Sequence, residues 1–187
     1  LLAKLKTKKN FVWIKRKLTP DQSKKIKQFN FKGIDFMEEF RRYYPNGNFA
    51  GQILGYTGID SQGLEGIENK YESLLAGKPK SYVVEKEGMY RTVPLSNISM
   101  KIPDQYSLHL TIDSTIQHFS EMALRDGVIN SNADRGTVIV LHSKSGAILA
   151  MASYPGFDPN QYQLYHRAHQ LNRAATSGYE PGSTFKM

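Results

Sequence analysis

Two apolar runs separated by a short polar connection place the strongest constraint on the fold of this chain. Residues 137–141 and 147–152 consist almost entirely of Val, Ile, Leu, Met and Ala, and the connection between them is His-Ser-Lys-Ser-Gly. Apolar runs of this length that flank a glycine-containing turn predict an antiparallel β-hairpin over residues 136–153. Because neither run alternates polar with apolar residues, we expect the hairpin to be buried on both faces.

A helix is predicted directly before this hairpin, over residues 113–129. Asp113 or Ser114 can cap it, since the side-chain oxygen of either residue can accept a hydrogen bond from a free backbone N–H of the first turn. The apolar residues expected on one face are Ile116, Phe119, Ala123 and Gly127 or Val128. We therefore expect this helix to pack on the hairpin.

The first part of the chain has shorter predicted elements. The run Thr-Pro-Asp at 19–21 is a helix start and predicts a helix over residues 20–29. Glycines recur at close spacing from Gly51 to Gly66, which predicts tight loops rather than a long regular element. A second helix is predicted over residues 65–75, with Gly77 as its stop.

Three strands are predicted between these helices and the one at 113–129. They cover residues 81–86, 90–95 and 106–112, and the first two form a hairpin across a Glu-Gly turn. Helices mixed with hairpins indicate the α+β class. The change of pattern near residue 105 predicts two units, 1–105 and 106–187.

Composition excludes several kinds of chemistry. The 187 residues include no Cys, so disulfides, thiol nucleophiles and Cys-based metal sites are excluded. His166 and His169 lie in a polar stretch, where we expect a solvated loop and no metal site. The sequence has no apolar run long enough to cross a bilayer, so no membrane span is predicted within it.

Basic residues are concentrated in residues 1–42 and account for much of the net charge of +8. Such a region fits an anionic membrane surface, an acidic partner or a solvated face. Nucleic acid is not an expected partner. No nucleic-acid-binding motif accompanies the basic residues, and aromatic residues do not alternate with them as a stacking platform requires.

The final residues, Tyr-Glu-Pro-Gly-Ser-Thr-Phe-Lys-Met at 179–187, contain a candidate catalytic pair. If a helix begins at Ser183, Lys186 lies one turn further along the same face. A lysine whose pKa is lowered by burial and positive neighbours can accept the serine proton, and N–H groups at the helix start can stabilise an oxyanion. Ser-x-x-Lys is common by chance, however, and on these four residues alone an exposed helix start is the simpler interpretation.

The residues around this pair resemble penicillin-binding proteins along nearly the whole chain. Residues 172–186 are similar to the active-site segment of that family, and Ser-Gly-Ala-Ile-Leu-Ala-Met-Ala-Ser-Tyr-Pro at 145–155 is similar to the opening of its transpeptidase domain. Arg-Tyr-Tyr-Pro at 42–45 and Gly-Leu-Glu-Gly-Ile-Glu at 63–68 resemble the membrane-proximal pedestal of the class B members. Phe-Val-Trp-Ile-Lys-Arg at 11–16 resembles the segment after the membrane anchor in the cell-division type.

The resemblance implies a serine D,D-transpeptidase of septal peptidoglycan synthesis that needs no metal or organic cofactor. Ser183 would attack the carbonyl between the two terminal D-Ala residues of a peptidoglycan stem peptide, and Lys186 would be the general base. β-Lactam antibiotics would acylate the same serine. The implied partners are a membrane-embedded glycosyltransferase and other division proteins. The implied location is the extracytoplasmic side of the inner membrane, with an anchor outside this sequence.

The sequence departs from the family in lacking the Ser-x-Asn and Lys-Thr-Gly motifs expected after Lys186. We therefore expect an incomplete and inactive fragment of a longer enzyme. It would comprise the pedestal over 1–105 and the first helix and hairpin of a transpeptidase domain over 106–187. An elongation-type class B protein and a non-catalytic envelope interaction module remain alternatives. A serine β-lactamase or penicillin sensor is disfavoured because pedestal-like sequence precedes the domain.

Overall fold

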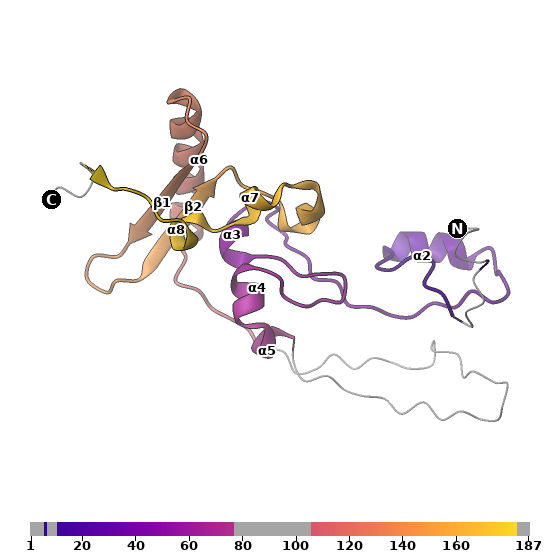
Figure 1. The fold of residues 1–187 in the computed structure, drawn as a ribbon. Coiled ribbons are helices and arrows are strands. Elements are labelled where there is room, and N and C mark those ends of the chain that lie inside the picture. Colours follow the sequence, from indigo (N-terminus) through magenta and orange to yellow (C-terminus); the bar gives the residue numbers. More distant parts are fainter. Residues whose placement is uncertain (1–5, 7–10, 77–105, 183–187) are drawn as a thin grey trace. The chain divides into compact units, whose positions relative to one another are not determined.

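The computed structural model describes residue 6 and residues 11–76 and 106–182. Its contacts divide the chain into two units, one formed by Leu1–Arg42 with Lys78–Asp104 and the other by Tyr43–Gly77 with Gln105–Met187. Figure 1 labels the helices and strands of both. The strands predicted at 81–86 and 90–95 lie outside the described residues. The boundary predicted near 105 stays a prediction, and the contacts group residues 43–77 with the second half of the chain.

In the first unit, helix α2 runs from Pro20 to Lys27. Thr19 and Gln22 form a capping box, in which each side chain accepts a hydrogen bond from the backbone N–H of the other residue. Acidic Asp21 lies in the first turn and lysines lie in the last turn, which complements the helix dipole. The helix predicted over 20–29 is confirmed.

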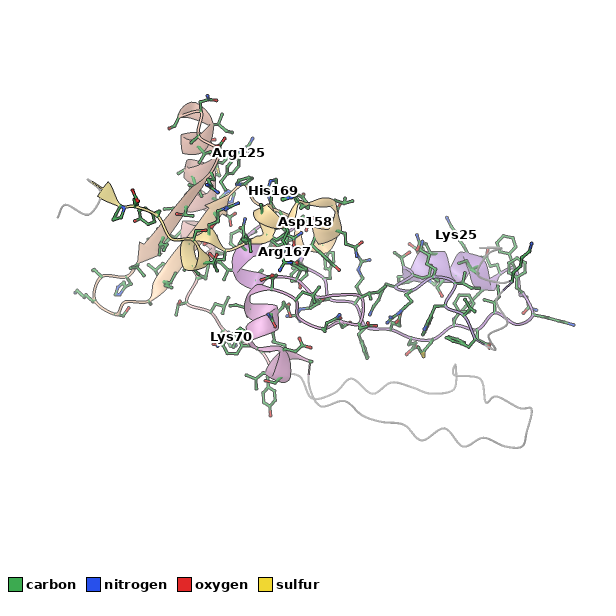
Figure 2. All side chains as sticks on the ribbon, viewed as in Figure 1. Lys25, Lys70, Arg125, Asp158, Arg167 and His169 are labelled. Carbon is green, nitrogen blue, oxygen red and sulfur yellow. The ribbon has the colours of Figure 1, made fainter. Side chains whose placement is uncertain are left out.

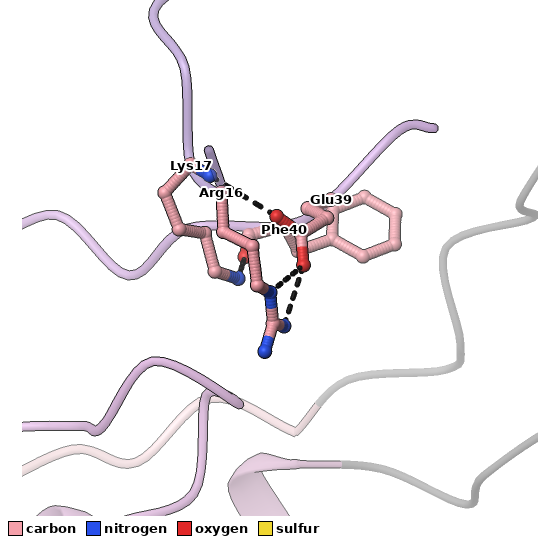
Figure 3. A network of polar contacts seen from close by, with 4 residues as sticks. All are labelled: Arg16, Lys17, Glu39 and Phe40. Atoms are coloured by element: carbon pink, nitrogen blue, oxygen red, sulfur yellow. Dashed lines mark hydrogen bonds and ion pairs between the residues drawn. The ribbon is translucent and has the colours of Figure 1, made fainter. Parts of the chain in front are cut away.

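A carboxylate joins two segments of the first unit that are more than twenty residues apart in sequence (Figure 3). Arg16 Nε and Nη2 donate to Glu39 Oε1 at 2.8 and 2.5 Å, and the backbone N–H of Lys17 donates to Oε2 at 3.1 Å. The Lys17 ammonium donates to the Phe40 carbonyl. Burial raises the pKa of Glu39, but the hydrogen bonds from Arg16 and Lys17 and their charges outweigh it. The pKa of this carboxyl therefore lies below its ordinary value of 4.5.

In the second unit, residues 43–76 form three short helices, α3 (Gly51–Leu54), α4 (Gly66–Lys70) and α5 (Glu72–Leu75). The predicted tight loops are confirmed at Gly55, whose φ is +76° and where an added Cβ would lie 1.7 Å from the Glu65 carbonyl oxygen. The single helix predicted over 65–75 is wrong. It breaks at Tyr71, whose φ of −113° and ψ of 24° are not helical, and continues as α5.

The second unit is centred on a helix and a hairpin: α6 (Ser114–Asn130), β1 (Gly136–Leu141) and β2 (Ile148–Tyr154) (Figure 1). The N-cap is Asp113, whose carboxylate accepts from the N–H groups of Thr115 and Ile116, both at 2.9 Å. The strands pair antiparallel from Gly136 opposite Tyr154 onwards. The helix and the hairpin predicted from the sequence are confirmed, and so is the α+β class.

The two faces of the hairpin differ in burial. On the face that packs on α6, Ala150 and Ala152 are buried, and a Cβ added to Gly136 would lie 2.7 Å from a side chain of that helix. These small residues let helix and sheet approach closely. On the opposite face, Ile139 and Leu141 are 46% and 58% exposed. The expectation that the hairpin is buried on both faces is therefore wrong for β1, because too little of the described chain covers this face.

Residues 106–112 do not form the predicted strand. They have no regular secondary structure, and at their end the Thr111 hydroxyl donates to the Ile148 carbonyl at 2.7 Å and the Asp113 N–H donates to the Leu149 carbonyl at 2.9 Å. Residues 106–111 are exposed, and none of the strands that the structure describes pairs with them. Alternating sequence alone cannot make a strand when no neighbour supplies the ladder of hydrogen bonds.

The chain after β2 includes the stretch around His166 and His169, where a solvated loop was predicted. It contains three short helices, η2 (Pro159–Leu164), α7 (Arg167–Gln170) and α8 (Arg173–Thr176). Among the helices of the described residues, none combines the length and the hydrophobicity needed to cross a bilayer.

Candidate active site

The predicted nucleophile and base, Ser183 and Lys186, lie outside the described residues. The described chain that leads to them runs from α6 through the hairpin and the three short helices to Gly182. Polar side chains from several parts of the second unit hold this path in place, and they define the candidate site as far as Gly182.

Gln117 of α6 is fully buried and joins the helix to β2. Its Nε2 donates to the Met151 carbonyl at 3.0 Å, and its Oε1 accepts from the Met151 N–H at 2.8 Å. The same Nε2 donates to Glu121 Oε1 at 2.7 Å, and that oxygen accepts from the backbone N–H of Ala50 at 2.8 Å. The Gln117 amide thus takes the place of a neighbouring strand at Met151 and connects β2 to residues 43–77.

The edge of β2 that faces away from β1 is occupied. Three carbonyl groups on this edge belong to Leu149, Met151 and Ser153, and they accept from the Asp113 N–H, the Gln117 amide and the Gln52 amide, respectively. The outer edge of β1 has no partner strand in the part of the chain that the structure describes. A further strand could therefore join this sheet only beside β1.

The apolar side of α6 borders an open groove of about 630 Å³ beside β1. Ile116, Phe119 and Ala123 line it, and Phe119 is 64% exposed. The apolar residues of α6 therefore share one face, as predicted, but in the described chain this face is open at the groove. The buried positions of the helix are Gln117 and Val128, because the close contact with β2 uses the small alanines of the strand and the amide of Gln117.

Asn160 joins the chain after β2 to the backbone of Tyr44. Its Oδ1 accepts from the Tyr44 N–H at 3.0 Å, and its Nδ2 donates to the Tyr44 carbonyl at 2.8 Å. Asp158 orients this side chain, since its Oδ1 accepts from both Nδ2 and the backbone N–H of Asn160, at 2.9 and 2.8 Å. Asp158, Arg167 and His169 are labelled on this part of the ribbon in Figure 2.

Gln52 of α3 is buried, and its Nε2 meets three backbone carbonyls. The oxygens belong to Ser153, Pro155 and His169, at 3.2, 3.1 and 3.0 Å. One side chain thereby connects the end of β2 with helix α7, although these groups lie 101 to 117 residues from Gln52 in sequence.

Tyr56 forms a third connection. Its hydroxyl donates to Gln170 Oε1 at 2.5 Å, and its ring stacks on Tyr162 with 4.2 Å between centroids. Burial raises the pKa of Tyr56, and the nearby Glu65 carboxylate adds to the effect, while Arg167 opposes it. The phenol therefore stays protonated and able to donate at neutral pH.

No role was predicted for Gln52, Gln117 or Asn160. Gln117 gave no signal of burial, because the residues one turn before and after it, Asp113, Ser114, Ser120 and Glu121, are all polar. The contacts of Gln52 and Asn160 could not be predicted either, because the backbone groups that they bind lie more than one hundred residues away.

Comparison with known families assigns both ends of the chain. Residues 2–102 match the family described as "Penicillin-binding Protein dimerisation domain". Residues 136–187 match the family described as "Penicillin binding protein transpeptidase domain". The second match includes β1, β2, the three short helices and the Ser183–Lys186 pair.

Individual proteins resemble the chain over most of its length. The peptidoglycan D,D-transpeptidase FtsI of Escherichia coli K12 is 33% identical over 180 residues, which are 96% of this chain and 30% of that protein. The probable peptidoglycan D,D-transpeptidase PenA of Neisseria gonorrhoeae is 36% identical over 95% of this chain and 31% of its own length. The solved penicillin-binding protein 3 of Mycobacterium tuberculosis in complex with aztreonam superposes with a TM-score of 0.60 at 29% identity, over 78% of this chain and 29% of that chain.

Proposed function

This chain belongs to the penicillin-binding proteins, and from that premise we propose that the full-length protein is a peptidoglycan D,D-transpeptidase of septal cell-wall synthesis. The observation that carries the proposal is that the segment matching the transpeptidase domain, residues 136–187, includes Ser183 and Lys186 at the Ser-x-x-Lys spacing. The chain spans about a third of the length of the relatives named as D,D-transpeptidases, and their names support the same activity here.

The proposed reaction is acyl transfer in two steps. The Ser183 oxygen attacks the carbonyl carbon between the two terminal D-Ala residues of a stem peptide while the neutral Lys186 amine accepts the hydroxyl proton. The C–N bond then breaks, and D-Ala leaves with a proton returned by Lys186. The amine of a neighbouring stem peptide attacks the ester and restores the serine. A β-lactam forms the same ester when its ring opens. No atom changes its oxidation state in this sequence.

The incomplete sheet supports the assignment to a larger domain. We propose that a further strand of the transpeptidase domain pairs with the outer edge of β1, since the outer edge of β2 is occupied. Apolar residues of the same domain would then cover Phe119 and the groove beside α6, because an exposed apolar surface often marks a place that another part of a protein contacts.

The test is covalent labelling of the full-length protein with a fluorescent penicillin. Ser183→Ala should abolish labelling, because the proposed acyl bond forms on the Ser183 oxygen, and Lys186→Ala should slow it at least about a hundredfold, the scale of a lost general base. Ser177→Ala is a matched control, because this exposed serine lies six residues upstream and outside the Ser-x-x-Lys motif. Normal labelling of Ser183→Ala would exclude Ser183 as the nucleophile, whereas a wild-type protein that does not label would favour the alternative of a non-catalytic interaction module.

We also propose a location at the extracytoplasmic face of the membrane, with a membrane-embedded glycosyltransferase and other division proteins as partners. The basic residues of the first unit support contact with an anionic surface. Co-sedimentation with vesicles containing phosphatidylglycerol should weaken as salt rises, because exposed charges are screened. Binding that high salt leaves undiminished would contradict the electrostatic part of this proposal.

A further inference from the structure

One short stretch of the dimerisation-domain match, residues 44–56, fixes the chain after β2 at several points. The backbone of Tyr44 forms hydrogen bonds with the side chain of Asn160. The Gln52 amide donates to the carbonyls of Pro155 and His169, and the Tyr56 hydroxyl donates to the side chain of Gln170. Each of these partners precedes Ser183 within the transpeptidase match. The sequence assigned to one domain therefore determines the backbone path of the other.

Gln52 has the most demanding position of these residues. Three carbonyl oxygens converge within 3.2 Å of its Nε2, which carries only two hydrogens, so the donors are shared among them. The side chain is only 8% exposed, so water has little access to replace it. Without a donor at this point, the three carbonyl dipoles would face one another in a largely dry environment, which is costly.

Two of the three carbonyls lie at the two ends of one chain segment, residues 155–169, which contains η2. Pro155 follows β2 directly and His169 lies in α7, so Gln52 holds the two ends of this segment together. Directly after it the chain returns to the sheet, where Asn172 Nδ2 lies 3.2 Å from Met151 Sδ and begins helix α8. A change in the closure at Gln52 therefore shifts the last element before Ser183 relative to the sheet.

We infer that Gln52 is a positioning residue for acyl transfer, which fixes the path of the chain from β2 to Ser183. The inference rests on the proposed function. Gln52 touches neither substrate nor reacting atoms in this role. It acts through the backbone, and it makes a residue of the dimerisation-domain match part of the transpeptidase site. A displacement of about 1 Å at a reacting group can lower the reaction rate about a hundredfold, so a small shift of the chain that leads to Ser183 should be measurable as a slower reaction.

The experiment uses the full-length protein and separates the rate of penicillin labelling from the fraction of protein labelled at completion. Gln52→Leu removes the donor at similar volume, and Gln52→Glu replaces it with an acceptor of the same shape. Gln62→Glu is the matched control, because it places the same charge on an exposed residue of the same dimerisation-domain match. We expect both Gln52 variants to label to completion at about one tenth to one hundredth of the wild-type rate at pH 8, and the control to label at the wild-type rate.

A pH series gives a second readout, which is taken on the labelling rate and not on the fraction of protein labelled, because a buried glutamate also changes stability with pH. Burial favours the protonated form of the carboxyl that Gln52→Glu introduces, and that form regains one O–H donor for the carbonyls. The measured quantity is the labelling rate of each variant divided by the wild-type rate at the same pH. For Gln52→Glu this ratio should rise about tenfold or more as the pH is lowered from 8 to 5.5, while for Gln52→Leu it stays low. The charged and titratable groups on the surrounding elements, which include His169, Glu121, Glu65, Arg167 and Tyr56, are the same in both proteins, so dividing by the wild-type rate removes the pH dependence that both share.

The inference is overturned if the Gln52 variants label at the wild-type rate. It is also overturned if they label at that rate in a reduced fraction of the protein, which would mean that Gln52 only stabilises the fold. A Gln52→Glu ratio that does not change with pH would contradict the role of the donor. In each of these cases an unlabelled Ser183→Ala leaves the proposed function standing, whereas a normally labelled Ser183→Ala removes the proposed function itself.

Discussion

Replacing the buried Gln117 with leucine tests how α6 is held to the sheet. Leucine fills similar space but makes none of the three hydrogen bonds of this amide, two with the Met151 backbone and one with Glu121. At about 1 kcal/mol for each bond, the loss is about 3 kcal/mol. The cost rises toward about 5 kcal/mol if the N–H and carbonyl of Met151 are left buried without partners, since each such group costs about 1–3 kcal/mol.

Hydrogen exchange in the full-length protein measures this loss at the bond concerned. A loss of about 3 kcal/mol corresponds to exchange of the Met151 amide about a hundredfold faster, since each 1.4 kcal/mol is a factor of ten. His118→Leu is the control, because the neighbouring His118 is exposed and its replacement should change stability by no more than about 0.5 kcal/mol. If Gln117→Leu leaves the exchange of Met151 unchanged, the amide does not hold the helix to β2, and the reasoning is refuted.

Three further predictions concern other parts of the described chain. Gly47→Ala should lower the free energy of unfolding by only about 1–2 kcal/mol, because the φ of Gly47 is +59° but the space around it is open. Gly55→Ala should lower it several times more, because the added Cβ would lie 1.7 Å from a carbonyl oxygen. Similar unfolding midpoints for the two variants would contradict this. Phe157→Ala should lower the free energy of unfolding by about 3–5 kcal/mol, because this residue is 1% exposed, and a thermal unfolding midpoint equal to that of the wild type would contradict this. The pKa of Glu39 is lowered in the folded state, so its stabilising contribution is complete above pH 4.5 and is lost as the pH falls through the lower folded-state value. The NMR shift of the Lys17 amide should therefore change with pH with a midpoint below 4.5. A midpoint at or above that value would show that the contacts with Arg16 and Lys17 do not lower the pKa of Glu39.

Local signals in the sequence predicted the elements that depend on local physics. The cap at Thr19, the cap at Asp113 and the hairpin around His-Ser-Lys-Ser-Gly were all predicted, because capping oxygens and turn residues act within a few positions of one another. The family was also predicted from an ordered series of short motifs, and the comparisons confirm it.

The failures involve contacts over long distances in sequence. Residues 106–112 alternate like a strand, but only tertiary pairing decides whether such a segment joins a sheet. The shared apolar face of α6 was predicted, but the burial of Gln117 was not, because its amide binds the backbone of Met151, which lies 34 residues away in sequence. Gln52 and Asn160 gave no signal, since nothing near them in the sequence indicates which carbonyls they bind.

The central claim is that Ser183 forms the acyl bond. The most direct measurement is mass spectrometry of the full-length protein after reaction with penicillin, followed by peptide mapping. The account predicts one added penicillin for each protein molecule, located on the peptide that contains Ser183, and no adduct in Ser183→Ala. An adduct on any other residue, or the same adduct in Ser183→Ala, would contradict it.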